Sequence, residues 1–429
     1  MNILWITNRI FPEAQSLLDW GRSHELKTTG GWVLGLADTL VQQPEVQLSI
    51  ASPSPMVSQL TIIEGVKITY CLYPIGKGYR KYNKEYEPLW REIVAQVKPD
   101  VVHIHGTEYN FGITFLNACP ELKQKTVISL QGMPSAIAPY FYSGLFTWDI
   151  LKNITFRDVM RWETIYHARK DFERRGKELE IPALQACRHI VGRTNWDRAH
   201  SWAINPNAQY HFCNEILREE FYSGNWTYDA CEKNTLFVSQ AGYALKGLHL
   251  VLEAMPLILQ ANPDVEIRIA GPNILRRDSL NQKLRFSGYA KILRKMIKKY
   301  HLEGHVQFLG PLNAEEMKQE LLQANMYLCP STIENSPNSL GEAQMLGVPC
   351  VASYVGGVAD MIPNDNCGTM YRFDDTAMLA HAVVETLSAS TTFDNTEMKQ
   401  IARKRHDRQS NVRTMMDIYK TVAACSRSL

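Results

Sequence analysis

Residues 325–347 read NMYLCPSTIENSPNSLGEAQMLG. The first six residues form an apolar run of strand length, the next several are small, polar or proline, and a helix-like segment follows. A strand that leads through a loop into a helix is the repeating unit of an open α/β sheet. Ligands of such sheets bind beyond the carboxyl ends of the strands. Two carboxylates, Glu334 and Glu342, stand eight positions apart across this boundary. We therefore predict a ligand site here.

The same alternation of strand and helix runs along the whole chain, in two series. The first series of predicted strands is 2–7, 46–52, 101–106, 126–132 and 189–194. After the polar, aromatic stretch 221–234, the second series is 235–240, 265–271, 305–310, 325–330 and 348–353. Each series is long enough for its own domain. We expect an α/β protein with two Rossmann-like α/β/α domains that face each other across a cleft.

Composition narrows the functional class. The chain has 429 residues, 45% hydrophobic, with a net charge of +2, so nucleic acid is not an expected partner. Nine scattered cysteines without a CxxC pair favour reduced thiols in a cytoplasmic setting. The N-terminus suits a buried strand better than a signal peptide, and the most apolar long stretch, 248–261, is too short for a membrane span. We predict a cytoplasmic protein, and leave open a peripheral contact with the inner face of the cell membrane.

The start of the predicted helix is suited to an anion. Proline is accepted in a first helical turn because its missing N–H would be unpaired there. The free backbone N–H groups of Asn338, Ser339 and Leu340, together with the helix dipole, suit a diphosphate. Glu334 would reach a polar group beside that phosphate, and Glu342 would accept hydrogen bonds from a ribose diol. A sugar and a nucleoside on either side of a diphosphate is a nucleotide sugar.

This E-x7-E arrangement resembles the signature of retaining glycosyltransferases of the GT-B fold, glycosyltransferase family 4. LKGLHLVLEAM (245–255) is similar to the family's K-G segment, which implies that Lys246 holds the donor diphosphate. ASYVGGVADMI (352–362) is similar to another family segment, with Asp360 where glutamate is usual. AGP (270–272), FLGPL (308–312), TGGW (29–32), VVHIHG (101–106) and SLQG (129–132) also fall at family positions.

The resemblance implies the domain layout and the roles of residues. It implies an acceptor domain over 1–212, a nucleotide-sugar domain over 213–405 and a helix over 406–429 that crosses back onto the first domain. Glu334 and Lys246 are the implied catalytic residues. The implied donor-binding residues are Glu342, Asn338, Ser339, Leu340, Gly31, Gln240 and Gly242, and the acceptor-side residues are His105, Gln131 and Gly30. We expect no cofactor and no metal, since the chain contains no D-x-D sequence.

Two departures from the family pattern weaken its implications. The family's arginine ahead of the K-G segment is replaced by Gln240 or Ala241, and Arg193 and Arg218 are candidates to supply the missing cation. A histidine that the family often places near the reacting centre is Gln131 here. The leading interpretation is metal-independent, retaining transfer from a nucleotide sugar to a saccharide or lipid-linked saccharide, in bacterial surface polysaccharide or glycoconjugate synthesis. The alternatives are a catalytically degenerate scaffold subunit and, less favoured, a nucleotide-sugar epimerase.

Three further segments have competing interpretations. His103 and His105 alternate on a predicted strand, and we expect one to face the core and the other the cleft. Residues 146–180 suit either a membrane-docking surface or, as we favour, a long solvated helix that packs one apolar stripe on the first domain. The basic segment 283–300 is interpreted as an ordinary solvated helix.

Overall fold

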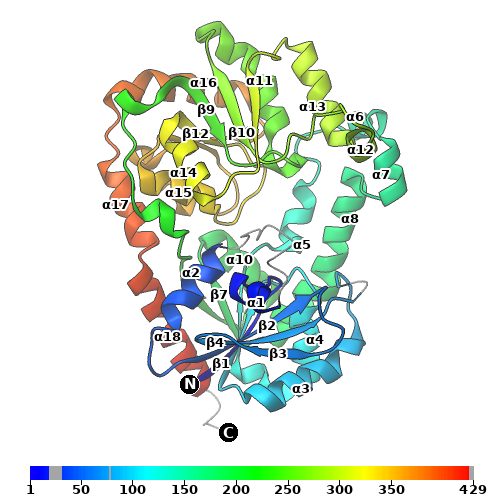
Figure 1. Cartoon of the computed structure of the whole chain (residues 1–429). Helices are drawn as coiled ribbons and strands as arrows, with labels where there is room; N and C mark the ends of the chain where they lie inside the picture. The colour runs from blue at the N-terminus through cyan, green and yellow to red at the C-terminus, as the bar shows by residue number, and fades with distance from the viewer. Residues whose placement is uncertain (19–30, 77–78, 425–429) are drawn as a thin grey trace. The chain divides into compact units, whose positions relative to one another are not determined.

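The structure is a computed structural model of the chain and describes residues 1–18, 31–76 and 79–424 (Figure 1). The chain divides into two compact units. Unit 1 consists of Met1–Ile137, Phe172–Ile216 and the residues from His406 onward, and unit 2 consists of Ala138–Asp171 and Leu217–Arg405. Sequence analysis placed 138–171 in the first domain, whereas the contacts group this segment with unit 2.

Unit 1 is built on an eight-stranded sheet, counted over its described residues. The strand order is β3-β4-β2-β1-β5-β6-β7-β8, and only β3 runs antiparallel to its neighbour. The strands are β1 (Asn2–Ile6), β2 (Gln47–Ser54), β3 (Thr61–Glu64), β4 (Ile68–Pro74), β5 (Val101–His105), β6 (Thr126–Ser129), β7 (His189–Gly192) and β8 (Gln209–Phe212). The helices are α1 (Pro12–Leu17), α2 (Gly31–Leu40), α3 (Glu87–Val97), α4 (Phe111–Ala118), α5 (Pro134–Ile137), α9 (Ile181–Ala186), α10 (Asn195–Ile204) and α18 (Arg408–Ala424).

The predicted strands of unit 1 are confirmed, and β3, β4 and β8 were missed. Low burial explains why two of the three missed strands, β3 and β8, were not predicted. Every residue of β5, β6 and β7 is buried, and each strand has a core of valine and isoleucine that sequence pattern can detect. The edge strands β3 and β8 contain no buried residue. Sequence pattern detects the strands that fill a core more easily than those at the rim of a sheet.

Unit 2 contains a parallel sheet of six strands within the described residues, in the order β11-β10-β9-β12-β13-β14. The strands are β9 (Glu232–Val238), β10 (Glu266–Ala270), β11 (Val306–Gly310), β12 (Ala324–Cys329), β13 (Cys350–Ser353) and β14 (Thr369–Tyr371). In sequence order this is 3-2-1-4-5-6, the Rossmann arrangement, whose strand order reverses between the central pair. The reversal lies between β9 and β12, which makes the carboxyl ends of these two strands the expected ligand site.

Helices cover both faces of this second sheet. On one face, α11 (Leu248–Ala261), α13 (Gly288–Lys299) and α16 (Thr376–Ala389) bury an apolar cluster that includes Leu252, Leu293 and Val383. On the other face, α14 (Ala314–Gln323), α15 (Asn338–Leu346) and α17 (Thr396–Arg405) contribute to a cluster that includes Leu321 and Leu340. Coverage of both faces is the ordinary condition of a parallel sheet.

The segment 146–180 is not one long helix, so that prediction is wrong. It forms α6 (Thr147–Lys152), α7 (Phe156–Arg161), α8 (Ile165–Arg175) and a π-helical turn over Gly176–Glu180. The apolar residues do not all pack inward either, because many of those in α6 and α7 are exposed. Beside them, in unit 2, lie α12 (Leu280–Arg285) and α13. Over the residues that the structure describes, no helix combines the length and hydropathy needed to cross a bilayer.

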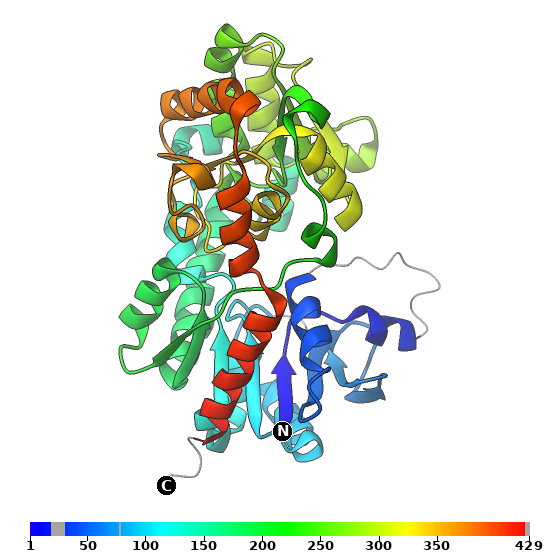
Figure 2. The same cartoon turned by 90° about the vertical axis from the view of Figure 1, so that its left-hand side faces the viewer.

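The last helix completes the core of unit 1, as Figure 2 shows for its position beside the N-terminal strand. In α18, the hydroxyl of Tyr419 accepts a hydrogen bond from Trp5 Nε1 at 2.9 Å and lies 2.6 Å from His103 Nδ1. Tyr419 and Trp5 are fully buried. A side chain near the end of the sequence therefore satisfies polar groups on β1 and β5. The predicted C-terminal helix that packs on the first unit is present.

Candidate functional site

The loops that follow β9 and β12 bring Lys246 and Glu334 together. Lys246 Nζ lies 2.5 Å from Glu334 Oε1, and both side chains are largely buried. Burial by itself would lower the pKa of Lys246, but the carboxylate of Glu334 and the nearby Tyr243 outweigh it and raise the pKa above its ordinary value. The ammonium group is therefore charged at neutral pH and held at the switch point of the sheet.

Glycine at 247 is required for this approach. Gly247 adopts φ +74°, and a Cβ at this position would lie 1.8 Å from the carbonyl oxygen of Pro330. The Thr332 N–H also donates to the carbonyl oxygen of Leu245 at 2.8 Å. Since any side chain at 247 would push the two loops apart, the K-G pair in the sequence has a steric reason.

A second glycine supports Glu334 from the other side. Gly356 has φ +51°, and a Cβ there would lie 1.8 Å from the Glu334 carbonyl oxygen. The Gly357 N–H donates to that same oxygen at 3.0 Å. The V-G-G stretch thus fixes the backbone of the loop that carries Glu334.

The helix α15 begins at Asn338, as the sequence indicated, with Pro337 as its N-cap. Proline supplies no capping side chain, so no side chain of this residue competes for the first backbone N–H groups. Leu340 N–H donates to the Pro337 carbonyl oxygen at 3.0 Å, so the prediction that this N–H is free is wrong, and the candidate donors are those of Asn338 and Ser339. Ser339 Oγ lies within hydrogen-bond distance of Ser239 Oγ and the Tyr327 hydroxyl. This helix start has the open donors and dipole that an anion site needs.

Glu342 forms a bidentate ion pair with Arg218. The guanidinium donates to its two carboxylate oxygens at 2.7 and 2.8 Å, and only 4% of the glutamate side chain is exposed. Burial raises the pKa of Glu342 above its ordinary value, and Arg218 opposes that rise. Two oxygens offer about four lone-pair positions, so Glu342 retains acceptors for a further ligand while its orientation is fixed.

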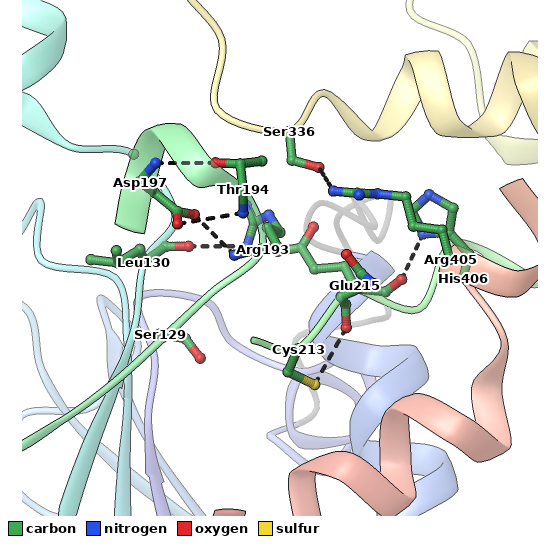
Figure 3. Close-up of polar contacts among 12 residues, drawn as sticks. Ser129, Leu130, Arg193, Thr194, Asp197, Cys213, Glu215, Ser336, Arg405 and His406 are labelled. Carbon is green, nitrogen blue, oxygen red and sulfur yellow. Dashed lines mark hydrogen bonds and ion pairs between the residues drawn. The ribbon is translucent and has the colours of Figure 1, made fainter. Parts of the chain in front are cut away.

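Arg405 is a further cation at this site that sequence analysis missed. Its guanidinium donates to Ser336 Oγ at 3.3 Å, in the loop between Glu334 and α15 (Figure 3). It also donates to the Asp360 carbonyl oxygen at 3.2 Å. In sequence it is one of several basic residues at the end of α17, so composition alone does not distinguish it. Its position is a result of tertiary packing.

The other predicted donor-binding residues are Gln240 and Gly242 in unit 2 and Gly31 in unit 1. Gln240 and Gly242 are exposed in the loop after β9, whereas Ala241 is buried in the core, so Gln240 is the residue whose side chain is open to a ligand. Gly31 is the first residue of α2 in unit 1. Gly30 lies outside the described residues.

His103 and His105 lie on the same face of β5, which corrects the expectation that one faces the core and one the cleft. Residues two apart on a strand share a face. Their rings stack at 3.8 Å between centroids, and both are buried. Burial lowers the pKa of both, that of His105 to about 3. Because His103 bonds to Tyr419 and Ser129, it is a structural residue.

His105 and Gln131 also line a cavity of about 20 Å³ in unit 1, together with Arg193 and Glu215. This is room for about one water molecule. Arg193 Nη1 donates to the Leu130 carbonyl oxygen at 3.0 Å and lies 2.7 Å from Glu215 Oε1 (Figure 3). The two arginines proposed as substitutes are thus each paired with a carboxylate, Arg193 in unit 1 and Arg218 in unit 2.

Two carboxylates of unit 1, the partly buried Glu108 and the fully buried Glu180, were not predicted. Glu108 Oε1 accepts from the Gly132 N–H at 2.6 Å, and Glu180 accepts from the N–H and hydroxyl of Ser135. Burial raises the pKa of both, that of Glu180 to about 7. Both brace the loop that follows Gln131. No group of three or more His, Cys, Asp or Glu residues with metal-binding geometry occurs within the described ranges.

A protein-family model matches part of the second unit of the chain. Residues 225–405 match the protein family described as glycosyl transferases group 1. The matched range contains Lys246, Glu334 and Glu342, so the resemblance to group 1, or family 4, glycosyltransferases that the sequence indicated is confirmed.

Three curated relatives are 24–28% identical to the chain over their aligned residues. WcaL of Escherichia coli (strain K12), a glycosyltransferase assigned to colanic acid biosynthesis, is 24% identical over 190 residues, which is 43% of this chain and 42% of the relative. The phosphatidylinositol N-acetylglucosaminyltransferase GPI3 subunit of Saccharomyces cerevisiae is 24% identical over 79% of this chain and 67% of its own. The corresponding gpi3 subunit of Schizosaccharomyces pombe is matched over only 25% of its length.

Solved structures share the fold over nearly the whole chain. Sucrose-phosphate synthase from Thermosynechococcus elongatus matches with a TM-score of 0.67 at 14% identity, covering 98% of this chain and 99% of its own. Anabaena HepE in complex with UDP and glucose matches with a TM-score of 0.61 at 14% identity, over 98% and 99% of the two chains. The GT-B fold predicted from the sequence is confirmed.

Proposed function

We propose that the chain is a retaining glycosyltransferase that moves a sugar from a nucleotide diphosphate sugar to a saccharide acceptor without a metal ion. The supporting observation is the Lys246–Glu334 pair at the β9/β12 switch point. Beside it, α15 begins without a capping side chain. Together they provide a fixed cation and open N–H donors for a diphosphate.

The proposed chemistry relies on stabilising the leaving group. As the glycosidic bond to the diphosphate breaks, negative charge grows on the leaving oxygen, and Lys246 with the α15 N–H groups would neutralise it. Glu334 would exchange its bond to Lys246 for bonds to the donor sugar hydroxyls. The proton of the acceptor hydroxyl would pass to the departing diphosphate on the same face. No side chain needs to act as a base, because catalysis would rest on positioning the reactants and on stabilising the leaving group.

Glu342 would hold the ribose of the donor nucleoside. Its carboxylate keeps one fixed orientation because Arg218 grips both oxygens, and its remaining lone pairs can accept from a vicinal diol. In this proposal Arg218 supplies part of the positive charge that the family's missing arginine would bring. It acts through Glu342.

The names of similar proteins suggest which substrates to test first. Anabaena HepE has been solved with UDP and with UDP-glucose, so UDP-linked sugars are the first donors to test. WcaL is assigned to colanic acid biosynthesis, which supports a saccharide acceptor in surface polysaccharide synthesis. The GPI3 subunits are named for transfer to phosphatidylinositol, so a lipid-linked acceptor belongs in the same panel.

The test is calorimetric binding and slow hydrolysis of UDP-, GDP- and ADP-linked sugars, with and without EDTA. We expect one nucleotide class to bind, EDTA to have no effect, and Lys246→Met to reduce turnover about 100-fold. Glu334→Gln should lose turnover as well, while Glu253→Gln, an exposed glutamate on α11, serves as the matched control. No binding of any donor would reject the proposed site and favour a scaffold subunit. Loss of activity in EDTA would reject the metal-independent mechanism.

A further inference from the structure

Unit 2 exposes a concentration of large apolar side chains on α6 and α7. Among the described residues, 23 large hydrophobic side chains are exposed, and eight of them fall within 146–166. They are Phe146, Trp148, Leu151, Phe156, Val159, Met160, Trp162 and Tyr166. We refer to these eight residues as the docking face. Since isolated exposed hydrophobics are ordinary but clusters are not, this grouping requires an explanation.

In α7 the apolar side chains face solvent and a carboxylate faces inward, the reverse of an ordinary surface helix. Phe156, Val159 and Met160 have the i, i+3, i+4 spacing of one helix face, and all three are exposed. The residue that points inward is a carboxylate, Asp158, of which only 2% is exposed. It caps α7 together with Thr155 and accepts from the Gly288 N–H at 2.8 Å. The sequence thus folds with a charge inside and an apolar stripe outside.

Trp162 is also placed against its own conformational preference. It ends α7 in the left-handed region, at φ +52° and ψ +40°, with 73% of its surface exposed. Glycine or asparagine is the residue that this position ordinarily favours. Within the unit its ring meets His167 edge-on, 5.0 Å between centroids, but most of its surface still faces solvent. A tryptophan in this strained and exposed position points to a contact outside the unit.

The docking face is anchored to the rest of unit 2. Lys295 of α13 donates to Asn153 Oδ1 at 2.6 Å, and Lys291 donates to the Lys152 carbonyl oxygen at 3.4 Å. On its inner side α13 buries Ile292 and Leu293 in the core. These contacts give α6 and α7 a fixed orientation, so the apolar stripe is a preformed surface.

The surroundings of the docking face are strongly basic. Residues 276–299 include α12 and α13, which lie beside α7 and α6 (Figure 1), and contain nine lysines and arginines and one aspartate. The whole chain has a net charge of only +2. The excess positive charge is therefore concentrated next to the exposed tryptophans and aliphatic side chains. Apolar and aromatic residues bordered by lysine and arginine are what an anionic bilayer surface attracts.

We propose that the docking face inserts into the headgroup region of an anionic lipid bilayer, with the basic residues of α12 and α13 against the lipid phosphates. Trp148 and Trp162 suit this level because an indole favours the boundary between hydrocarbon and water. A second copy of the chain is the weaker candidate for this surface, since it would bring an equally basic neighbourhood into contact. The inference does not depend on the proposed reaction.

Co-sedimentation with vesicles tests this proposal. The full chain is mixed with vesicles of phosphatidylcholine alone or of phosphatidylcholine and phosphatidylglycerol at seven to three. We expect binding to the anionic vesicles that weakens with added salt. Trp148→Ser or Trp162→Asn should weaken it at least about tenfold, and Lys283→Gln or Arg285→Gln about fivefold each. Trp202→Ser, which removes a tryptophan of matching exposure from unit 1, should have no effect.

Trp162→Asn guards against loss of fold, because asparagine tolerates the left-handed conformation and should leave the melting temperature unchanged or raised. Hydrolysis of a donor sugar, which needs no membrane, should be unchanged in all these variants. Vesicle binding that survives the tryptophan substitutions would overturn the proposal. So would a dimer in solution that the same substitutions convert to a monomer, because the docking face would then cover a second copy.

Discussion

Replacing Gly356 with alanine tests whether the loop that carries Glu334 must keep its position. The added Cβ would lie 1.8 Å from the Glu334 carbonyl oxygen, whereas real Cβ contacts essentially never fall below 3.0 Å. The two must therefore separate by at least about 1.2 Å, and the contact is with backbone, which cannot swing away as a side chain can. The hydrogen bond from Gly357 N–H to the same oxygen would be strained as well.

Backbone strain and the steric clash both contribute to the effect of Gly356→Ala, and a control variant separates them. Gly356 has φ +51°, so alanine costs roughly 1–2 kcal/mol in backbone strain before any clash. Gly144 has φ +81° with its nearest neighbour atom at an ordinary 3.8 Å, so Gly144→Ala carries the strain without the clash. A displacement of about 1 Å at a reacting group can cost about 100-fold in rate. We expect Gly356→Ala to lose stability beyond the control and to lower kcat about 100-fold.

The assay pairs urea unfolding with steady-state turnover of the donor sugar found in the binding panel. Gly144→Ala should lose stability and keep its kcat, whereas Gly356→Ala should lose both. Equal stability losses in the two variants, with kcat unchanged in Gly356→Ala, would refute the reasoning. In that case, either the loop absorbs the methyl group elsewhere or Glu334 does not need the position that the structure gives it.

Lys246→Met should lower kcat about 100-fold, roughly 3 kcal/mol of transition-state stabilisation, and a kcat at the wild-type level would contradict the role of Lys246. Arg218→Gln leaves the buried Glu342 without its counter-charge, so urea unfolding at pH 8 should show a loss of roughly 3–5 kcal/mol. That loss should be smaller at pH 5, where the glutamate can protonate, and the Arg218→Gln/Glu342→Gln double variant should recover most of it. Burial raises the pKa of Glu180 to about 7 from an ordinary 4.5, against the opposing bonds from Ser135. Between those values the folded chain holds a proton that the unfolded chain releases, so the free energy of unfolding falls as pH rises. Glu180→Gln should remove this fall, a gain of up to roughly 3 kcal/mol at pH 8 and none at pH 4; an unchanged pH profile would contradict it.

The sequence predicted those parts of the fold that rest on local pattern. The buried strands β5 and β12 are rich in apolar residues, and α15 starts directly after the proline that marks it. The K-G and V-G-G segments were recognised by resemblance, and the structure supplies their steric reason. The edge strands β3 and β8 were not predicted, because none of their residues is buried and burial therefore imposes no apolar pattern on them.

Other features depend on contacts between distant segments, which no local pattern encodes. The pairing of Arg218 with Glu342 joins residues 124 positions apart. Arg405 reaches Ser336 because α17 packs beside α15. The inverted polarity of α7 was misread because an apolar stripe at helical spacing looks the same whether it faces a core or solvent. The side of α7 that faces inward is the side of Asp158, which accepts a hydrogen bond from the Gly288 N–H, 130 positions away in the sequence.

The hydrogen bonds of Tyr419 to Trp5 and His103 have a consequence for synthesis on the ribosome. The sheet of unit 1 begins with β1, which is made before unit 2, but its core is closed by α18, which is made after unit 2. Unit 2 has no such dependence, since its chain ends at Arg405, before that helix is made. We expect unit 2 to reach its native state first, while unit 1 of the nascent chain remains incomplete and Trp5 remains uncovered. A nascent chain arrested before residue 406 should therefore protect unit 2 from protease and leave β1 and β5 open to cleavage.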